Sequence, residues 1–513
     1  MKVMDLKHAL HTLMRYAREQ GLYVAADEYT VRHQLMHILQ LDAWPDAVVA
    51  DPVPLGQIQP VLDALVADAF TRGVIPNDGV TQRDLLDTAI MGCFVAAPSV
   101  IQAEFAQNYH RSPQAATQYF YQQSRASNYI RMARTAKNNC WKHRCSYGEL
   151  DITINLSKPE KDPKAIIAAG RAKSASYPKC LLCRENEGYA GRIDHPARQN
   201  LRLIPLTLNN EQWFLQYSPY EYYNEHCIVL KAEHEPMKLT RATFVRLLDF
   251  VAQFPHYFLG SNADLPIVGG SILSHDHFQG GCYEFAMSRA AVEYTFVWSK
   301  YSDIEVQQLI WPMSVLRLRS RHAAQLVDAA DELLNKWRGY SDAAVDIFAH
   351  TDDTPHNTVT PIARMREGVF ELDLVLRNNR TSEAHPLGIF HPHAELHHIK
   401  KENIGLIEVM GLAVLPDRLQ TALERLAACL RGEEQLANYL ELAAHADWFA
   451  QIAPSYVMGT DAQVYLKAAI GDVFVQVLND AGVYKRDTAG QAGFRRFLNM
   501  CCIRHDRSSN AGG

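Results

Sequence analysis

The chain has 513 residues, of which 48% are hydrophobic and 21% charged, a balance typical of a globular protein with roughly two to four domains. A formal net charge of −6 excludes the global basic field with which many proteins bind nucleic acid or acidic lipid. Ten cysteines in a chain of this length are too sparse for a disulfide scaffold. A site for an anionic ligand must therefore be local.

The N-terminal part of the chain predicts helices. Leu6, Leu10, Leu13 and Ala17 form one face of an amphipathic helix that lacks the unbroken apolar core of a signal peptide. Apolar residues recur at helical spacing in 57–72, 84–96 and 114–137. The longest weakly polar run, 89–101, is shorter than the roughly 18 residues needed to span a bilayer. We therefore expect a cytoplasmic protein with no membrane segment.

Strands begin at about residue 149, where Leu150, Ile152 and Ile154 alternate with polar residues in the period-2 pattern of a half-buried strand. A helix is predicted from Thr240, a favourable N-cap, to Phe254, with Pro255 as its stop. A second helix is predicted over 322–337, and helices return after Pro416. Further strands are predicted at 212–216, 227–230, 272–277, 314–320, 345–349, 358–363 and 369–376. The tail 507–513 is expected to be disordered.

This pattern predicts an α+β fold. The predicted strands and helix of the stretch from 149 to about 300 recur in a similar order in the second half of the chain. This similarity is compatible with a degenerate internal duplication, although residue identity between the halves is too low to prove one. We predict a helical N-terminal region over 1–148, a catalytic domain over 149–310, and a second domain with C-terminal helices over 311–513.

The stretch Asp264 to Gly281, "DLPIVGGSILSHDHFQGG", places His275 and His277 two residues apart between glycines. On a strand, residues i and i+2 share a face, so the two imidazoles can share one site. The glycines let a ligand approach the backbone, whose free amides can cradle a phosphate. Two metal ligands, or a hydrogen-bonded core pair, are the ordinary alternatives for such a pair.

Cys180 and Cys183 have the spacing with which two thiolates chelate one tetrahedral zinc ion, although a redox pair or chance spacing is about as common. Two more ligands are needed, and we favour His234 and His275. The zinc would then be structural, and His277 would stay free.

A free imidazole beside phosphate-binding amides can act as a nucleophile that forms a covalent nucleotidyl-histidine and passes the nucleotide to a second phosphate. Gln279 could donate to a non-bridging phosphate oxygen as charge develops there. In isolation, a solvated polar residue would be the default interpretation of Gln279.

A second cluster lies between Arg377 and Lys401 and contains Arg380 and five histidines, from His385 to His398. Its density suggests phosphate recognition, a second metal, or both, with a solvated histidine-rich loop as the ordinary alternative. His391 and His393 form a rival HxH pair. We prefer His277, because no paired glycine precedes His391 and a carboxylate at Glu395 would repel a phosphate.

The glycine–histidine stretch resembles the signature of the type 2 galactose-1-phosphate uridylyltransferases, a bacterial class of the histidine-triad superfamily. The segments "YPKCLLCRENEGYAGR", "HPARQNLR", "HNTVTPIAR" and "ELDLVLRNNRTSEAHPLGIFHPHAELHHIKKENIG" resemble that family as well. The likeness covers roughly residues 149–416, and we expect it to extend over the whole chain.

The resemblance implies exchange of the uridylyl group between UDP-glucose and galactose 1-phosphate, with no organic cofactor, by two histidine-triad-like units of antiparallel sheet and helix. It implies His277 as the nucleophile and Gln279 as its phosphate-contacting neighbour. It also implies phosphate contacts from Gly269, Gly270 and Ser271, and zinc ligation by Cys180, Cys183, His234 and His275. Arg377 and Arg380 are our further candidates for substrate binding. We expect a homodimer that binds neither nucleic acid nor membrane.

This sequence departs from the type 1 pattern. Asp276 and Phe278 replace the proline and glycine of the type 1 histidine motif, and the strand "FELDLVL" offers no histidine pair for the second metal of type 1 enzymes. Two alternatives therefore stay open: a histidine-triad-type nucleotide phosphorylase or hydrolase, and a zinc-stabilised interaction module without catalysis. Incubation with labelled UDP-glucose separates the module from an enzyme.

Overall fold

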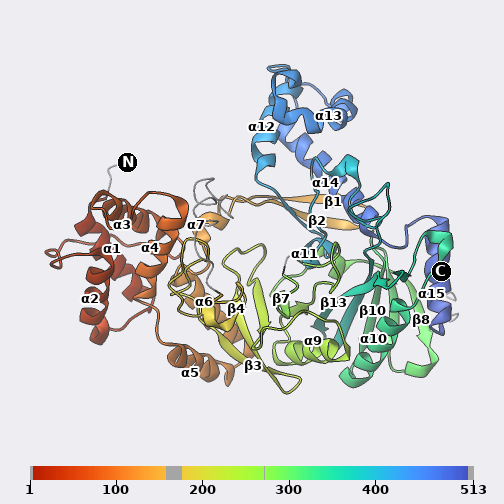
Figure 1. Ribbon diagram of the computed structural model, residues 1–513, viewed down its shortest axis with the longest axis horizontal. Coiled ribbons are helices and arrows are strands. Elements are labelled where there is room, and N and C mark those ends of the chain that lie inside the picture. The colour runs from red at the N-terminus through yellow and green to blue at the C-terminus, as the bar shows by residue number, and fades with distance from the viewer. Residues whose placement is uncertain (1–3, 158–175, 271, 506–513) are drawn as a thin grey trace. The chain divides into compact units, whose positions relative to one another are not determined.

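The fold was analysed in a computed structural model that describes residues 4–157, 176–270 and 272–505 (Figure 1). The predicted disorder of the tail 507–513 lies outside the described residues. Helices and antiparallel sheet are both extensive, which confirms the α+β class. The chain divides into two compact units: the first comprises Met1–Lys137, Ser157–Glu235 and His275–His277, and the second comprises Asn138–Leu156, Pro236–Ser274 and Phe278–Gly513. The three contiguous domains drawn from the sequence stay a prediction.

The first unit begins with helices that enclose their own apolar core. Leu10, Leu13 and Ala17 of the first helix are fully buried in it, as the amphipathic pattern predicts. The predicted helix 114–137 is wrong as one element, because Ser127 ends α6 and Asn128 adopts a left-handed φ of 55° before the short α7. The helices are α1 Leu6–Glu19, α2 Glu28–Leu39, α3 Gln59–Thr71, α4 Val80–Gly92, α5 Pro98–Tyr109, α6 Pro113–Ala126 and α7 Met132–Thr135.

An antiparallel sheet follows in the first unit, with β4 between β3 and β5. Its strands are β3 Ile204–Leu208, β4 Glu211–Tyr217 and β5 Cys227–Lys231, so the predicted strands 212–216 and 227–230 are confirmed. Tyr217 joins this sheet to the helices, because its hydroxyl donates to the Thr117 carbonyl of α6 at 3.0 Å.

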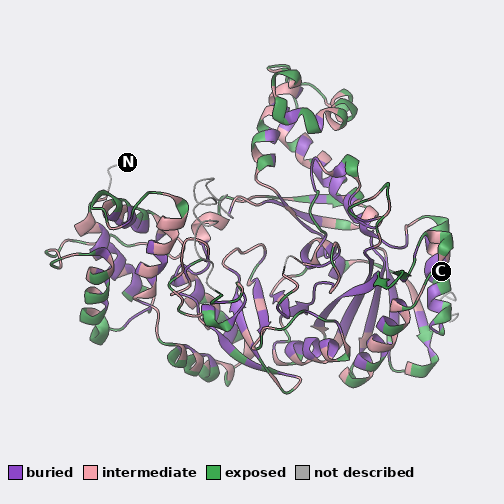
Figure 2. Ribbon diagram, viewed as in Figure 1, coloured by how far each residue is buried: buried purple, intermediate pink, exposed green. Residues whose placement is uncertain are grey.

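The second unit is built on an antiparallel sheet in the order β16-β8-β9-β10-β14-β13-β6-β7. The central strands β13 and β14 are buried on both faces over most of their length (Figure 2). Its strands are β6 Phe258–Gly260, β7 His277–Gly281, β8 Val292–Trp298, β9 Glu305–Leu309, β10 Val315–Ser320, β13 Asn357–Arg366, β14 Val369–Asn378 and β16 Ile503–His505. A small sheet pairs β1 Asn139–Cys145 with β2 Gly148–Ile154 and, in parallel, β15 Leu412–Leu415, and a hairpin joins β11 His350–Thr351 to β12 Thr354–Pro355.

Helices α9 and α10 pack against this sheet, and α12 packs against α14. Thr240 is the N-cap of α9 as predicted, and its backbone amide donates to the Thr243 hydroxyl at 3.1 Å. The helices of this unit are α9 Arg241–Gln253, α10 Ala323–Arg338, α11 Leu406–Val409, α12 Arg418–Leu430, α13 Ala446–Ile452, α14 Ala462–Ala481 and α15 Thr488–Met500. No helix among the described residues is long and apolar enough to traverse a lipid bilayer.

Two predicted strands are wrong. The segment predicted as strand over 345–349 contains a 3-10 turn, Ala343–Val345, followed by Asp346 at a left-handed φ of 58°. The strand predicted over 272–277 starts only at its last residue, His277. Before it, the backbone of Asp276 bonds to Glu235 and Lys231 in an irregular connection.

Candidate active site and metal centre

The four predicted metal ligands meet within the first unit. Cys180 and Cys183 lie on a tight turn in which the Cys183 amide donates to the Cys180 carbonyl at 3.3 Å. His234 follows β5, and His275 precedes β7. One ligand atom from each residue lies within 4.8 Å of the other three. The sequence thus predicted a cluster that spans 96 positions of the chain, from residue 180 to residue 275.

The distances within this cluster suit one tetrahedral ion. The Sγ atoms of Cys180 and Cys183 are 3.5 Å apart, and the Cys180 Sγ lies 3.3 Å from His275 Nδ1. The Cys183 Sγ lies 3.1 Å from His234 Nδ1. Zinc–sulfur bonds of about 2.3 Å and zinc–nitrogen bonds of about 2.0 Å in a tetrahedron separate such ligand atoms by roughly 3.3–3.8 Å. The donor set therefore fits zinc.

Backbone and side-chain contacts hold the ligands in this orientation. His275 Nε2 lies 2.9 Å from the Lys231 carbonyl oxygen, which can only accept, so Nε2 carries the proton and Nδ1 is free for a metal. Asn186 donates to the carbonyls of Cys180 and Cys183 at 2.9 and 2.7 Å, and its own oxygen contacts His195. The sequence analysis missed Asn186 and His195, although both lie in segments that carry the family resemblance.

The two thiols differ in their surroundings. Burial acts to raise the pKa of both. The hydrogen bond with His275 nevertheless lowers the pKa of Cys180, whereas the neighbouring Cys180 sulfur helps to raise the pKa of Cys183 to about 11. Cys180 is therefore the thiol that ionises first.

His277 is the first residue of β7 and is 6% exposed. Its Nδ1 lies 2.9 Å from the His275 carbonyl oxygen, so Nδ1 carries a proton and the lone pair of the neutral ring is on Nε2. Burial lowers the pKa of His277 to about 4, which keeps the ring neutral. His275 thus contributes its ring to the metal cluster and its carbonyl to the orientation of His277.

The glycine loop before β7 is shaped by the protein itself. A Cβ at Gly269 would lie 2.6 and 2.7 Å from the carbonyl oxygens of Ala263 and Leu265, and one at Gly270 would lie 2.7 Å from Asn262 Nδ2. Ile267, just before the loop, has a φ of 73°, a strained conformation for a β-branched residue. Ser271 lies outside the described residues. The paired glycines are therefore required by close packing, whatever they do for a ligand.

The histidine-rich second cluster supports this loop. Asn379 donates to the Pro266 carbonyl at 3.2 Å. The Asn262 side-chain oxygen accepts from the Leu406 amide at 2.9 Å. Sequence analysis gave Asn262 and Asn379 no role, because neither partner is local in the chain. The glycine loop and the segment that begins at Arg377 therefore meet within the second unit.

The two predicted substrate-binding arginines have protein partners. Arg377 is 1% exposed and donates to Thr360 and to the Ile404 carbonyl, while burial lowers its pKa to about 10. Its Nε has no hydrogen-bond partner among the described residues. Arg380 pairs with Asp346 and lies over the Phe348 ring. Roles for Arg377 and Arg380 in substrate binding stay predictions.

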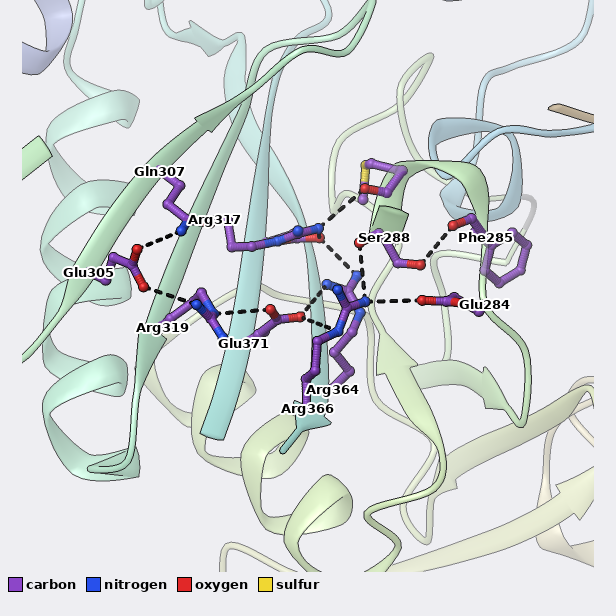
Figure 3. Close-up of polar contacts among 12 residues, drawn as sticks. Glu284, Phe285, Ser288, Glu305, Gln307, Arg317, Arg319, Arg364, Arg366 and Glu371 are labelled. Atoms are coloured by element: carbon purple, nitrogen blue, oxygen red, sulfur yellow. Dashed lines mark hydrogen bonds and ion pairs between the residues drawn. The ribbon is translucent and has the colours of Figure 1, made fainter. Parts of the chain in front are cut away.

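The strand "FELDLVL", which offers no histidine pair for a second metal, carries two buried carboxylates. Glu371 and Asp373 of β14 are 2% and 0% exposed and are paired with arginines of β10 and β13. Figure 3 shows Glu371 with Arg319 of β10 and Arg364 of β13. These guanidinium groups already neutralise the carboxylates. A different group, His393, Glu395 and Asp480, brings its ligand atoms within 4.8 Å of one another. The sequence did not predict that group.

Comparison with known proteins shows to which family the chain belongs. The family model for the N-terminal domain of galactose-1-phosphate uridyl transferase matches residues 22–236, and the model for the C-terminal domain matches residues 250–448. A galactose-1-phosphate uridylyltransferase of Clostridium acetobutylicum is 50% identical over 498 residues, which cover 96% of this chain and 100% of that protein. The one of Bacillus subtilis is 48% identical over 513 residues, covering 99% of this chain and 100% of the other.

A crystal structure of yeast Ap4A phosphorylase Apa2 matches 56% of this chain and 81% of its own with a TM-score of 0.30 and 12% identity. The full-length sequence relatives define the protein as a transferase. The chain belongs to the galactose-1-phosphate uridylyltransferase family, as its motifs predicted.

Proposed function

We propose that the protein exchanges UMP between UDP-glucose and galactose 1-phosphate through a covalent uridylyl-histidine at His277. The observation that carries the proposal is the Nδ1 contact of His277 with the His275 carbonyl, which directs the lone pair to Nε2. A neutral, buried imidazole held in one tautomer is a competent nucleophile. The names of the full-length relatives support the choice of substrates.

In the first half-reaction, His277 Nε2 attacks the α-phosphorus of UDP-glucose. A nitrogen–phosphorus bond forms, the bond to the bridging oxygen breaks, and glucose 1-phosphate leaves with the electron pair. In the second, a phosphate oxygen of galactose 1-phosphate attacks the same phosphorus and returns the lone pair to Nε2, giving UDP-galactose. Each half replaces one bond to phosphorus by another, so no redox partner is required.

Gln279 lies two residues after His277 on β7, which places the two side chains on the same face of the strand. We infer that its amide donates to a non-bridging oxygen as negative charge grows there. Gly269, Gly270 and Ser271 would offer backbone or hydroxyl donors to the phosphates, and Arg377 and Arg380 would add positive charge. These roles rest on the family resemblance.

Cys180, Cys183, His234 and His275 would hold zinc, whose contribution would be to fold stability. The ion would keep the His275 backbone in place, and that backbone orients His277. The two histidine-triad-like units and a homodimer complete the proposal; the homodimer is inferred because two-fold pairs are the commonest assembly.

The experiment uses UDP-glucose labelled in the uridylyl group. Denatured wild-type protein should retain label that is labile to acid and stable to alkali, as a phosphoramidate is. His277→Ala should retain none, whereas His391→Ala, which removes the first histidine of the rival pair, should still be labelled. Full labelling of folded His277→Ala would exclude the proposed nucleophile. Release of free UMP or UDP with no sugar-phosphate acceptor would instead favour a hydrolase or phosphorylase.

A further inference from the structure

A cavity of about 50 Å³ lies within the first unit, apart from the metal cluster and His277. By this measure one water molecule needs roughly 10–15 Å³, so the cavity has room for a small polyatomic ligand. Residues from four segments line it, and the polar ones that matter here are Asp84 and Thr88 of α4, Tyr129, Arg131 and Arg134 around α7, and Arg198.

The lining is rich in cations. Arg131 is 9% exposed, and its guanidinium bonds to Asp87 and, at 2.7 Å, to Thr88. Although burial acts to lower it, the pKa of Arg131 is raised by the charge of Asp87, so the group stays ionised. Arg134 forms a two-pronged ion pair with Asp84. These two arginines are therefore neutralised by protein carboxylates.

Arg198, unlike Arg131 and Arg134, is not paired with a carboxylate among the described residues. Its described hydrogen bond is to the Ala197 carbonyl at 3.1 Å. Its guanidinium lies over the Tyr129 ring, with 5.9 Å from Cζ to the ring centroid. The three arginines and two aspartates around the cavity therefore leave one positive charge without a counterion.

The Tyr129 hydroxyl also lacks a partner. Tyr129 is 3% exposed, and its buried oxygen makes no hydrogen bond to any described residue. A buried polar group left unpaired destabilises the folded protein, so such groups usually bind a ligand or a water. Tyr129 and Arg198 both line this cavity, and a ligand with acceptor oxygens and negative charge would satisfy both the hydroxyl and the guanidinium.

We propose that this cavity binds one tetrahedral oxyanion of phosphate size, held by Arg198 and by the Tyr129 hydroxyl. The ligand is either inorganic phosphate or the phosphoryl end of a phosphate ester. No residue of the cavity belongs to the proposed catalytic set, so the site does not depend on the proposed function.

Binding of labelled inorganic phosphate to the full-length protein would be measured by equilibrium dialysis at constant ionic strength, with glucose 1-phosphate in a parallel arm. Arg198→Met and Tyr129→Phe should each raise the dissociation constant at least tenfold. The control Arg241→Met removes a half-exposed arginine of α9 and should leave binding unchanged. Dependence on the cavity residues in the phosphate arm identifies the free ion, and in the ester arm alone it identifies a phosphoryl group.

Tyr129→Phe also separates binding from folding. Because the hydroxyl is buried without a partner, its removal should leave stability in phosphate-free buffer unchanged or higher, while abolishing the stabilisation that phosphate confers on the wild type. The proposal is overturned if ligand binding is the same in wild type and both cavity variants, or if Tyr129→Phe lowers stability without phosphate.

Discussion

Asp373 is the clearest case of a single residue whose charge depends on its neighbours. Its carboxylate accepts from Arg317 at 2.7 and 3.0 Å and from Arg364 at 2.8 Å; both arginines are labelled in Figure 3. Burial alone would raise its pKa, but the two guanidinium charges hold the pKa of Asp373 at about 2. The stability that Asp373 and its two arginines contribute is fully present above the pKa of roughly 4 that an aspartate has in the unfolded chain. It is lost as pH falls toward 2.

Asp373→Asn should lower the free energy of unfolding by about 3–5 kcal/mol, because it leaves buried guanidinium charge without its counterion. Denaturant unfolding at neutral pH measures this loss. Asp328→Asn, which removes the half-exposed partner of Arg241, is the matched control and should cost about 1 kcal/mol or less. Similar losses in the two variants would show that burial does not govern the network.

A second residue-scale prediction concerns glycine. Gly269→Ala should lower the free energy of unfolding by about 1–3 kcal/mol, since the added Cβ meets two backbone oxygens that can yield only if the loop moves. Gly339→Ala, at the C-cap of α10, meets no atom within 4 Å and should change stability by roughly 0.5 kcal/mol or less. Thermal unfolding compares the two, and equal effects would contradict the close packing of the glycine loop.

At the scale of elements, two buried histidines join the segment before α11, which contains His398, to the segment between α12 and α13, which contains His445. His398 Nδ1 and His445 Nδ1 are 3.0 Å apart, so one donates and the other accepts. Burial lowers the pKa of each to about 4, and the Arg418 charge acts in the same direction on both. The neutral pair is therefore stable above the unfolded histidine pKa of roughly 6.5, and its contribution is lost as pH falls from there toward 4.

We expect unfolding free energy to decrease between pH 6.5 and 4, and His445→Asn to flatten that decrease. Denaturant titrations at several pH values would measure both slopes. An unchanged slope in the variant would assign the acid sensitivity to other groups.

The elements also show what could be predicted from the sequence. Six elements lie close to the residues predicted for them from the pattern of apolar residues: helix α9 and strands β4, β5, β10, β13 and β14. The pattern is informative here because each element buries at least one apolar face in the core. The strand predicted over 272–277 fails, because the backbone of Asp276 bonds to Lys231 and Glu235 outside any regular strand, and these partners are more than 40 residues away in the chain. Ligand spacing predicted Cys180 and Cys183, and the family resemblance supported His234 and His275 as the other two ligands. By contrast, Asn262, Asn186 and the Tyr129 cavity depend on contacts between distant segments.

At the scale of the whole molecule, loss of a ligand from the proposed zinc site tests whether that site stabilises the fold. Cys180→Ser should lower the bound zinc and lower the melting temperature, because a structural zinc site contributes folding energy. Cys429→Ser, a partly exposed thiol outside the cluster, is the control and should retain both. Metal analysis and calorimetry test this, and an unchanged zinc content in Cys180→Ser would show that the ligand set is wrong.

The central claim is that UMP is covalently bound to His277 between two separable half-reactions. The most direct measurement isolates wild-type protein after exposure to uridylyl-labelled UDP-glucose, removes the free nucleotide, and adds galactose 1-phosphate alone. We predict that label leaves the protein and appears as UDP-galactose. Protein that carries no label after isolation, and product that forms only when both substrates are present together, would contradict the account.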